Sequence, residues 1–440
     1  MNIFSKFFKH GSISSDPEMQ FGRFTDTYKS EEKYKIWDEA IEDFENEKYL
    51  NAYIHFLDYL SNELQGNIKY VYSNGKLSFT IYQGSKIIEG EADFHFFKAE
   101  AKIIKAGTRH SGLMRKLLED NFNLKYARYA LDDEDTIYLK FDTFVEDGSP
   151  HKIYQALKEL ATEADRKDDI LMNDYPGLHT VNLHHTRQVT QEEIKVKYNF
   201  FSQSVRAVLF EIDNGQLDAK LYPGGISFLV LDMLYKIDYL VKPEGSIMEK
   251  IREMHEMYFN DNMMTVHEKN TVIINTIRNF EKISVAHFSK EIYEVSSTFG
   301  MSMPEGHQRL IEIVDAQMTD IDWYTKNKHY IYTKAICGYI TGFSLYSFSL
   351  PKPSISLLQL YYHITENQYF SELGFNDVYC DAKGNFNKLL IINKINLIIK
   401  ENKEKYGPIT INLKMLEFSD MHTFCRSYLL MLSKMKYPEY

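Results

Sequence analysis

Residues 67–96 read NIKYVYSNGKLSFTIYQGSKIIEGEADFHF, and the architecture of the N-terminal part of the chain follows from them. Apolar and polar residues alternate on both sides of Asn74-Gly75, a dipeptide that tolerates the positive φ angles of a tight hairpin turn. The Gln-Gly-Ser triplet at 83–85 marks a second turn. The stretch therefore predicts a run of antiparallel strands joined by short turns.

Helices and further strands are predicted on either side of these strands. Apolar residues at helical spacing over 31–60 predict one long helix or a helix hairpin, and residues 111–122 predict another helix. Ser149-Pro150 has the residue types of a helix N-cap and first turn. Additional strands are expected near 97–103, 125–131 and 136–144. This order predicts an α+β fold, with an antiparallel curled sheet and its helices on one face.

The pattern changes after residue 172. Residues 173–190 read as a linker, and helical periodicity dominates from Gln191 onward. The sequence therefore predicts an N-terminal tail (1–30), an α+β domain (31–172), a linker (173–190) and a mainly helical domain (191–440), either a bundle or a helical array. Within the helical domain, a helix is expected over Ser289–Ser297 and a short strand over Ile409–Met415.

The stretch from Trp37 to Asp169 resembles the type III secretion chaperone-like, or YbjN-like, fold. The resemblance rests on the leading helix, the meander that includes GNIKYVYSNGKLSFTIYQG, the unit LMRKLLEDNFNLKYARYALDDEDTIYLKFDTF and the closing helix SPHKIYQALKELATEAD. It implies a domain that binds unfolded or extended segments of client proteins, often as a dimer, without a cofactor or catalysis. The long C-terminal region is a departure from the small secretion chaperones and argues against a dedicated role in secretion.

Composition narrows the class of protein. The chain has 440 residues and a net charge of -11, which disfavours a nucleic-acid binder because such a protein needs a basic face. The three cysteines, Cys337, Cys380 and Cys425, form no C-x-x-C pair, so the sequence predicts neither a disulfide framework nor a zinc knuckle. A reducing cytoplasm is the expected location.

Two apolar stretches bear on membranes. The N-terminal MNIFSKFFKHG is too interrupted by lysine for a signal peptide, and its apolar residues form either a small amphipathic turn or a stub packed on the protein. The stretch Ala335–Pro351 is the least charged, but it is rich in Ser, Thr, Tyr and Gly, whereas a spanning helix needs ~20 predominantly apolar residues. A buried helix followed by a turn is therefore predicted there.

Motifs for phosphate, dinucleotide or serine-hydrolase chemistry are absent from the sequence. The nearest approach to a metal cluster is His179, His184 and His185 with Asp174 nearby. Their spacing matches no known site, so a solvated linker is the preferred interpretation, with zinc or nickel binding as the alternative.

Two other groups of residues have side chains that can bind a cation or act in catalysis. The acidic run Asp132–Asp135 fits a turn better than a cation site. His422 and Cys425 share one face of a predicted helix, but Cys425 is expected to pack in the core. No catalytic, cofactor-binding or metal-binding residue is therefore predicted, and the chain is expected not to be an enzyme.

Aromatic residues on the predicted sheet are the candidate partner-binding residues. They occur on both faces, which exceeds what one helix-covered face needs; they are Tyr70, Tyr72, Phe79, Tyr82, Phe94 and Phe96. The leading hypothesis is a non-enzymatic, chaperone-like protein that holds an extended polypeptide, and a homodimer is compatible with it. The alternatives are a structural subunit of a larger assembly and an enzyme with an unrecognised site.

Overall fold

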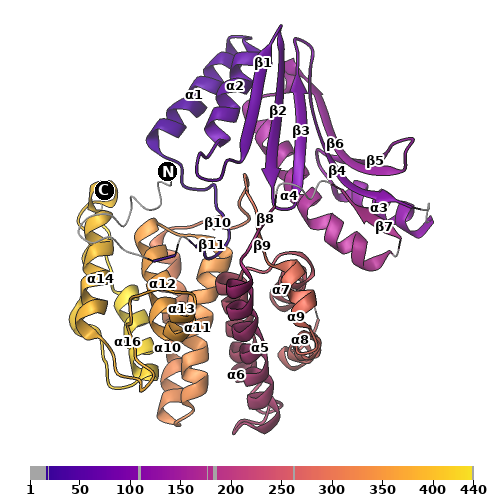
Figure 1. Ribbon diagram of the computed structural model, residues 1–440. Coiled ribbons are helices and arrows are strands. Elements are labelled where there is room, and N and C mark those ends of the chain that lie inside the picture. The colour runs from indigo at the N-terminus through magenta and orange to yellow at the C-terminus, as the bar shows by residue number, and fades with distance from the viewer. Residues whose placement is uncertain are drawn as a thin grey trace.

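The computed structural model describes residues 16–17, 19–107, 111–175, 177–181, 186–260 and 263–438. The fold is α+β, as predicted, and it is arranged in two lobes (Figure 1). We call residues 31–180 the sheet lobe and residues 186–438 the helical lobe. Each has a buried hydrophobic core, and Phe299 of the helical lobe joins the core of the sheet lobe.

The sheet lobe is built on a seven-stranded antiparallel sheet with the strand order β1-β2-β3-β4-β6-β5, in which β7 pairs with β4. Its strands are β1 (Ile68–Ser73), β2 (Lys76–Gln83), β3 (Lys86–Ala92), β4 (Phe96–Ala106), β5 (Arg128–Leu131), β6 (Thr136–Phe144) and β7 (Leu178–Thr180). Its helices are α1 (Glu31–Glu45), α2 (Tyr49–Leu60), α3 (Ser111–Asn123) and α4 (Pro150–Asp174). Strands β1 and β5 are therefore the two ends of this strand order, and β7 lies off it beside the end of β4.

The helices cover one face of the sheet. Leu77, Phe79 and Ile81 alternate along β2 into the core, where α4 packs across β2, β3, β4 and β6. Because residues paired across strands share a face, β1 presents Ile68, Tyr70 and Tyr72 to this covered side. The opposite face of the sheet carries the alternate residues, which are mostly polar but include Tyr82, Phe96 and Phe144.

Two local predictions are confirmed. Asn74 and Gly75 have φ angles of 52° and 75°, and Ser73 pairs directly with Lys76, which is the geometry of a type I′ hairpin. Ser149 caps α4 by accepting a hydrogen bond from the Lys152 amide. The long apolar pattern over 31–60 is resolved into the α1–α2 hairpin.

The helical lobe is a bundle around α11, which contacts α6, α10, α12 and α16. Its helices are α5 (Gln191–Asn214), α6 (Pro223–Lys236), α7 (Gly245–Phe259), α8 (Val266–Phe280), α9 (Val285–Phe288), α10 (His307–Lys326), α11 (Tyr330–Ser347), α12 (Lys352–Thr365), α13 (Asn367–Glu372), α14 (Lys388–Glu401), α15 (Lys403–Tyr406) and α16 (Met421–Ser433). A π-helical turn, Ile237–Val241, extends α6. The stretch Ala335–Pro351 is a buried helix and turn, as predicted. Every helix in the described part of the chain is too short or too polar to cross a membrane.

Three predicted segments differ from the structure. Ser289–Ser297 is not a helix: after a 3-10 turn it becomes extended, and β9 (Tyr293–Glu294) pairs with β8 (Arg187–Gln188). Ile409–Met415 forms a single bridge at Thr410 and a 3-10 turn instead of a strand. The stretch 173–190 contributes β7 and β8, so it is more than a linker. Two further two-residue strands, β10 (Met303–Pro304) and β11 (Phe348–Ser349), pair in parallel.

Helix α4 contacts α7 directly, with Arg166 and Glu249 3.8 Å apart, and two extended segments add further contacts between the lobes. Residues 296–300 lie against the end of β2, where Thr298 Oγ1 donates to the Tyr82 carbonyl over 2.9 Å and the Phe299 amide donates to Gln83 Oε1 over 2.9 Å. Residues 19–28, which we call the strap, run along the helical lobe and then enter α1 (Figure 1, indigo). The predicted tail 1–30 thus contains a packed segment.

Candidate functional site: the free edge and aromatic tip of the sheet

Strand β1 is an edge whose outer hydrogen-bonding groups face away from the sheet. The Tyr82 amide donates to the Asn67 carbonyl, so odd-numbered residues of β1 bond to β2. In an antiparallel ladder the alternate residues direct their N–H and C=O groups outward. These residues are Ile68, Tyr70 and Tyr72, and no hydrogen bond from another described segment reaches their backbone groups. The edge can therefore accept a further strand.

The six predicted aromatic residues do not form one surface. Phe79 is 3% exposed and packs on Phe97 with ring centroids 5.3 Å apart, so it belongs to the core and cannot contact a partner. Tyr70 lies on the same covered face and donates to Asp58 on α2 over 2.7 Å. Partial burial and the Asp58 carboxylate raise the pKa of Tyr70 to about 12.

The other predicted aromatics are more accessible. Tyr72 shares the covered face with Tyr70 but is half-exposed at the end of β1. Tyr82 lies on the opposite face, 5.3 Å from the Lys69 ammonium group. Phe94 is in the β3–β4 turn and Phe96 begins β4 on the opposite face. The prediction of aromatics on both faces is thus correct, although they are distributed over two faces and one turn.

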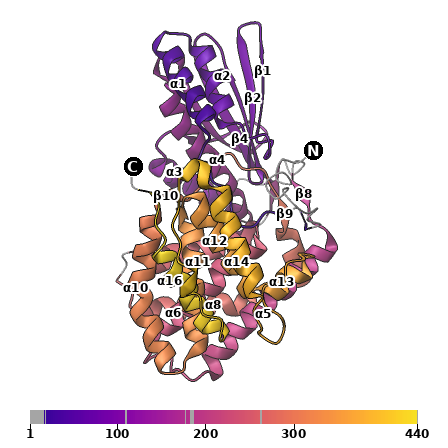
Figure 2. The same cartoon turned by 90° about the vertical axis from the view of Figure 1, so that its left-hand side faces the viewer.

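An exposed aromatic cluster lies where the strand ends meet. Phe96 pairs with Phe144 across β4 and β6, with ring centroids 4.9 Å apart. Phe94 is 68% exposed and Phe144 is 58% exposed. We call Phe94, Phe96 and Phe144 the aromatic tip. Figure 2 shows that the β1–β2 hairpin at this end of the sheet is remote from the helical lobe.

Phe144 was missed by sequence reasoning, although a signal exists. Ile137, Leu139 and Phe141 alternate on the covered face, so Phe144 is out of phase with them and must lie on the other face. Val71, also exposed, is out of phase with the covered residues of β1 in the same way. What the sequence does not state is the strand register that sets Phe144 beside Phe96.

Much of the remaining uncovered face is charged, with Tyr82 and Tyr138 lying beside lysine side chains. Lys140 on β6 contacts Glu100 on β4 over 2.8 Å, and Lys76 contacts Glu91 over 2.5 Å. Arg128 on β5 pairs with Asp142 in the same way. Cross-strand pairs of opposite charge are typical of a sheet face that remains in water. On this face the exposed rings of Phe96 and Phe144 therefore lie beside charged cross-strand pairs.

The predicted metal candidates gain no support from the described residues. His179 is exposed on β7, whereas His184, His185 and the side chain of Asp174 lie outside the described residues. The acidic run is a turn in which Asp132 Oδ1 accepts from the Thr136 amide over 2.7 Å. Among the described residues, no three potential ligands converge as a metal site requires.

His422 and Cys425 do not act together either. The His422 ring stacks on Tyr330 at 3.9 Å and its Nδ1 contacts Asp420 over 2.6 Å. Cys425 is buried, as predicted, and burial raises the pKa of its thiol to about 12. A thiol in this environment stays protonated and unreactive at neutral pH.

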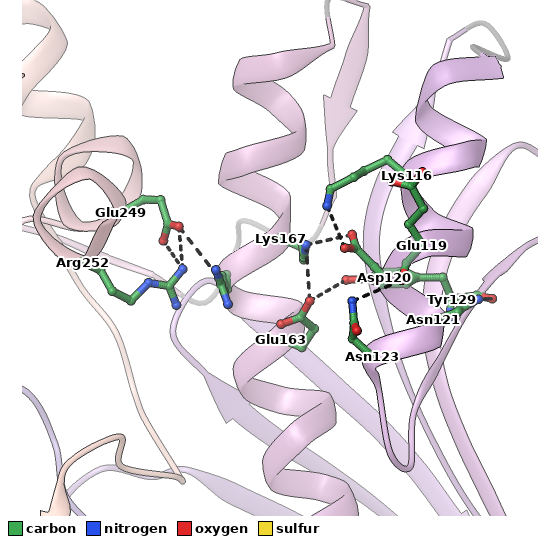
Figure 3. Close-up of polar contacts among 11 residues, drawn as sticks. Lys116, Glu119, Asp120, Asn121, Asn123, Tyr129, Glu163, Lys167, Glu249 and Arg252 are labelled. Atoms are coloured by element: carbon green, nitrogen blue, oxygen red, sulfur yellow. Dashed lines mark hydrogen bonds and ion pairs between the residues drawn. The ribbon is translucent and has the colours of Figure 1, made fainter. Parts of the chain in front are cut away.

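Two buried ionic clusters each pair a lysine with carboxylates. In the first, Lys167 on α4 contacts Asp120 on α3 over 2.8 Å and points between Asp120 and Glu163 (Figure 3). Burial alone would raise the pKa of Asp120, but the hydrogen-bonding ammonium groups of Lys167 and Lys116 lower it. Each described charge meets its opposite, so this cluster holds α3 against α4.

The second cluster lies in the helical lobe. Lys236 on α6 contacts Asp232 over 3.2 Å and Glu366, after α12, over 2.9 Å. Burial raises the pKa of Asp232 to about 6 in spite of the lysine. One ammonium group thus contacts two carboxylates and links α6 to the end of α12, but Asp232 Oδ1 is buried with no hydrogen-bond partner among the described residues.

Comparison with known proteins identifies no family for this chain. No protein-family model, no curated protein and no solved structure matches this chain. The candidate site therefore rests on the geometry of the sheet lobe.

Proposed function

We propose that the sheet lobe binds an extended polypeptide segment of another protein by strand addition to β1, without catalysing a reaction. The observation that carries the proposal is the outward orientation of the backbone groups of Ile68, Tyr70 and Tyr72 at an edge that no other described segment hydrogen-bonds. Backbone hydrogen bonds of this kind supply affinity, and side chains on alternate positions supply specificity.

The surroundings of the edge suggest which segments bind. An added strand places alternate side chains beside Tyr70 and Tyr72 on the covered side, where they extend the apolar surface. The other side chains face Lys69 and exposed Val71, on the strand that leads into the turn where the Phe94 ring lies against Gly75. We infer a partner segment with apolar residues at every second position. The resemblance of residues 37–169 to client-binding chaperones is consistent with this proposal.

Peptide selection tests the proposal with a defined probe. A displayed library of random peptides is selected on the full chain, and the enriched peptides are measured for affinity. We expect enriched peptides to alternate apolar and polar residues. Tyr72→Pro removes an outward N–H group that takes no part in the β1–β2 ladder, so the fold should tolerate it. We expect it to weaken binding at least about tenfold, equivalent to about 1.4 kcal/mol.

Tyr72→Thr is the matched control because it removes the ring and retains the N–H group. The proposal requires that Tyr72→Pro bind more weakly than Tyr72→Thr while both variants melt like the native chain. Equal binding of the enriched peptides to the native chain and to Tyr72→Pro would exclude strand addition at β1. Light scattering on the same samples distinguishes a foreign segment from pairing with a second copy.

A further inference from the structure

The helical lobe holds the strap in a way that resembles the recognition of a peptide ligand. We propose that the surface under the strap is an arginine-binding groove, and that the strap is its ligand within the same chain. We further propose that the strap can be exchanged for another segment carrying the order aromatic, glycine and arginine of Phe21-Gly22-Arg23. This site is separate from the β1 edge.

The guanidinium group of Arg23 meets three acceptors from the turn after α6. Its Nε donates to Asp238 Oδ1 over 2.9 Å, its Nη1 contacts Glu244 over 3.3 Å and its Nη2 donates to the Pro243 carbonyl over 2.8 Å. Planar, multiple donation of this kind is specific to arginine. The sequence separation between Arg23 and these acceptors exceeds 200 residues, so the contact is tertiary.

The two carboxylates need a cation. Asp238 and Glu244 side chains are each 7% exposed, whereas Arg23 is 30% exposed and reaches them from the surface. Burial raises the pKa of Glu244, and both Arg23 and Lys242 oppose that shift. Withdrawal of Arg23 would leave buried negative charge with less compensation, which is strongly unfavourable. The groove is therefore complementary to a positively charged ligand.

An aromatic pocket next to this site receives Phe21. The Phe21 ring centroid lies 5.0 Å from that of Phe370 and 5.9 Å from that of Phe375. Between the two anchors, the Gly22 amide donates to the Tyr239 carbonyl over 2.8 Å. Gly22 has a φ of 70°, and a Cβ atom there would lie 2.5 Å from the Tyr239 ring. The central position thus requires glycine.

The strap also reaches the sheet lobe, so its exchange would have a mechanical consequence. Asp26 accepts a hydrogen bond from the Tyr154 hydroxyl on α4 over 2.6 Å and from the Gly300 amide over 2.7 Å. A ligand that displaces the strap would remove these contacts between the lobes. The groove would then couple recognition of an arginine-containing segment to the positions of the two lobes.

Exchange can be measured on the whole folded protein. A protease recognition sequence is inserted between Lys29 and Ser30 in the full chain, and the purified protein is cleaved there. A labelled synthetic peptide of residues 16–28 is then added. We expect the labelled peptide to replace the cleaved strap and to preserve the melting temperature of the uncleaved protein.

Peptide variants identify the groups that are recognised. We expect Arg23→Gln and Gly22→Ala peptides to bind at least about tenfold more weakly than the native peptide. The matched control is a Thr27→Ala peptide, because the Thr27 hydroxyl bonds to Thr25 within the strap. Failure of the labelled native peptide to exchange, or equal binding of the Arg23→Gln peptide, would overturn the proposal.

Discussion

Phe299 lies in the core of the sheet lobe, although its segment belongs to the helical lobe, and its truncation tests whether that segment stabilises the sheet lobe. The ring is 2% exposed and packs edge-on against Tyr154, with ring centroids 5.6 Å apart. A phenylalanine removed from such a site costs about 3–5 kcal/mol, because apolar burial is lost and a cavity remains. We therefore expect Phe299→Ala to lower the free energy of unfolding of the sheet lobe by about that amount.

The two tryptophans report on different lobes, which makes the measurement direct. Trp37 lies on α1 and its ring contacts Tyr154, whereas Trp323 lies on α10. Urea unfolding followed by Trp37 fluorescence in a Trp323→Phe background isolates the sheet lobe.

Met301→Ala is the matched control, since Met301 is in the same segment and is 67% exposed. We expect it to change the free energy of unfolding by less than about 0.5 kcal/mol. If Phe299→Ala shifts the Trp37 transition by less than about 1 kcal/mol, the segment does not stabilise the sheet lobe as its burial indicates.

Two further predictions concern backbone strain and buried charge. Gly75→Val should lower the free energy of unfolding by about 1–3 kcal/mol, because φ is 75° and a Cβ atom would lie 2.6 Å from the Phe94 ring. Gly66→Val is the control, since φ is 56° there but no atom lies within 4 Å of the added Cβ atom. Urea unfolding should show a smaller loss of stability for Gly66→Val, and equal losses would contradict the crowding at Gly75. The pKa of Asp232 is about 6 in the folded chain and 3.8 in an ordinary aspartate. The folded state therefore binds this proton first, and the contribution of Asp232 to the free energy of unfolding rises as the pH falls through 6. Between about pH 8 and pH 4 this contribution amounts to on the order of 1–3 kcal/mol, and Asp232→Asn should lack it. If the pH profile of the unfolding free energy is the same in Asp232→Asn as in the native chain, Lys236 fully compensates the carboxylate.

The sequence predicts most reliably those features that a residue forms with its near neighbours in the chain. Asn74-Gly75 fixes a hairpin because the two residues themselves adopt positive φ. Ser149 fixes the start of α4 because its own hydroxyl accepts from the Lys152 amide. The α+β order of elements followed from such signals together with hydrophobic periodicity.

The candidate site was predictable only in part. Alternation along a strand divides its residues between two faces, but it does not state which face the helices cover. The structure places Phe79 in the core and Phe96 outside it, and the β4–β6 register adds Phe144 to the aromatic tip. Accessibility of an aromatic residue on a sheet depends on long-range packing, which one sequence does not encode in a local pattern.

The segments that join the lobes depended entirely on tertiary structure. Residues 289–297 have a helical spacing of apolar positions, yet the chain is extended at β9 and beyond, where residues 296–299 bond to the end of β2. Arg23 gives no local sign that it meets Asp238. Helix propensity contributes only a few tenths of a kcal/mol per residue. The buried hydrogen bonds of residues 296–299 and the core position of Phe299 exceed it. The sequence by itself determined most elements of the sheet lobe and their order, because those depend on neighbours in the chain. Tertiary packing decided which residues connect the lobes and which remain exposed, because many of the contacts between the lobes join residues more than 200 positions apart.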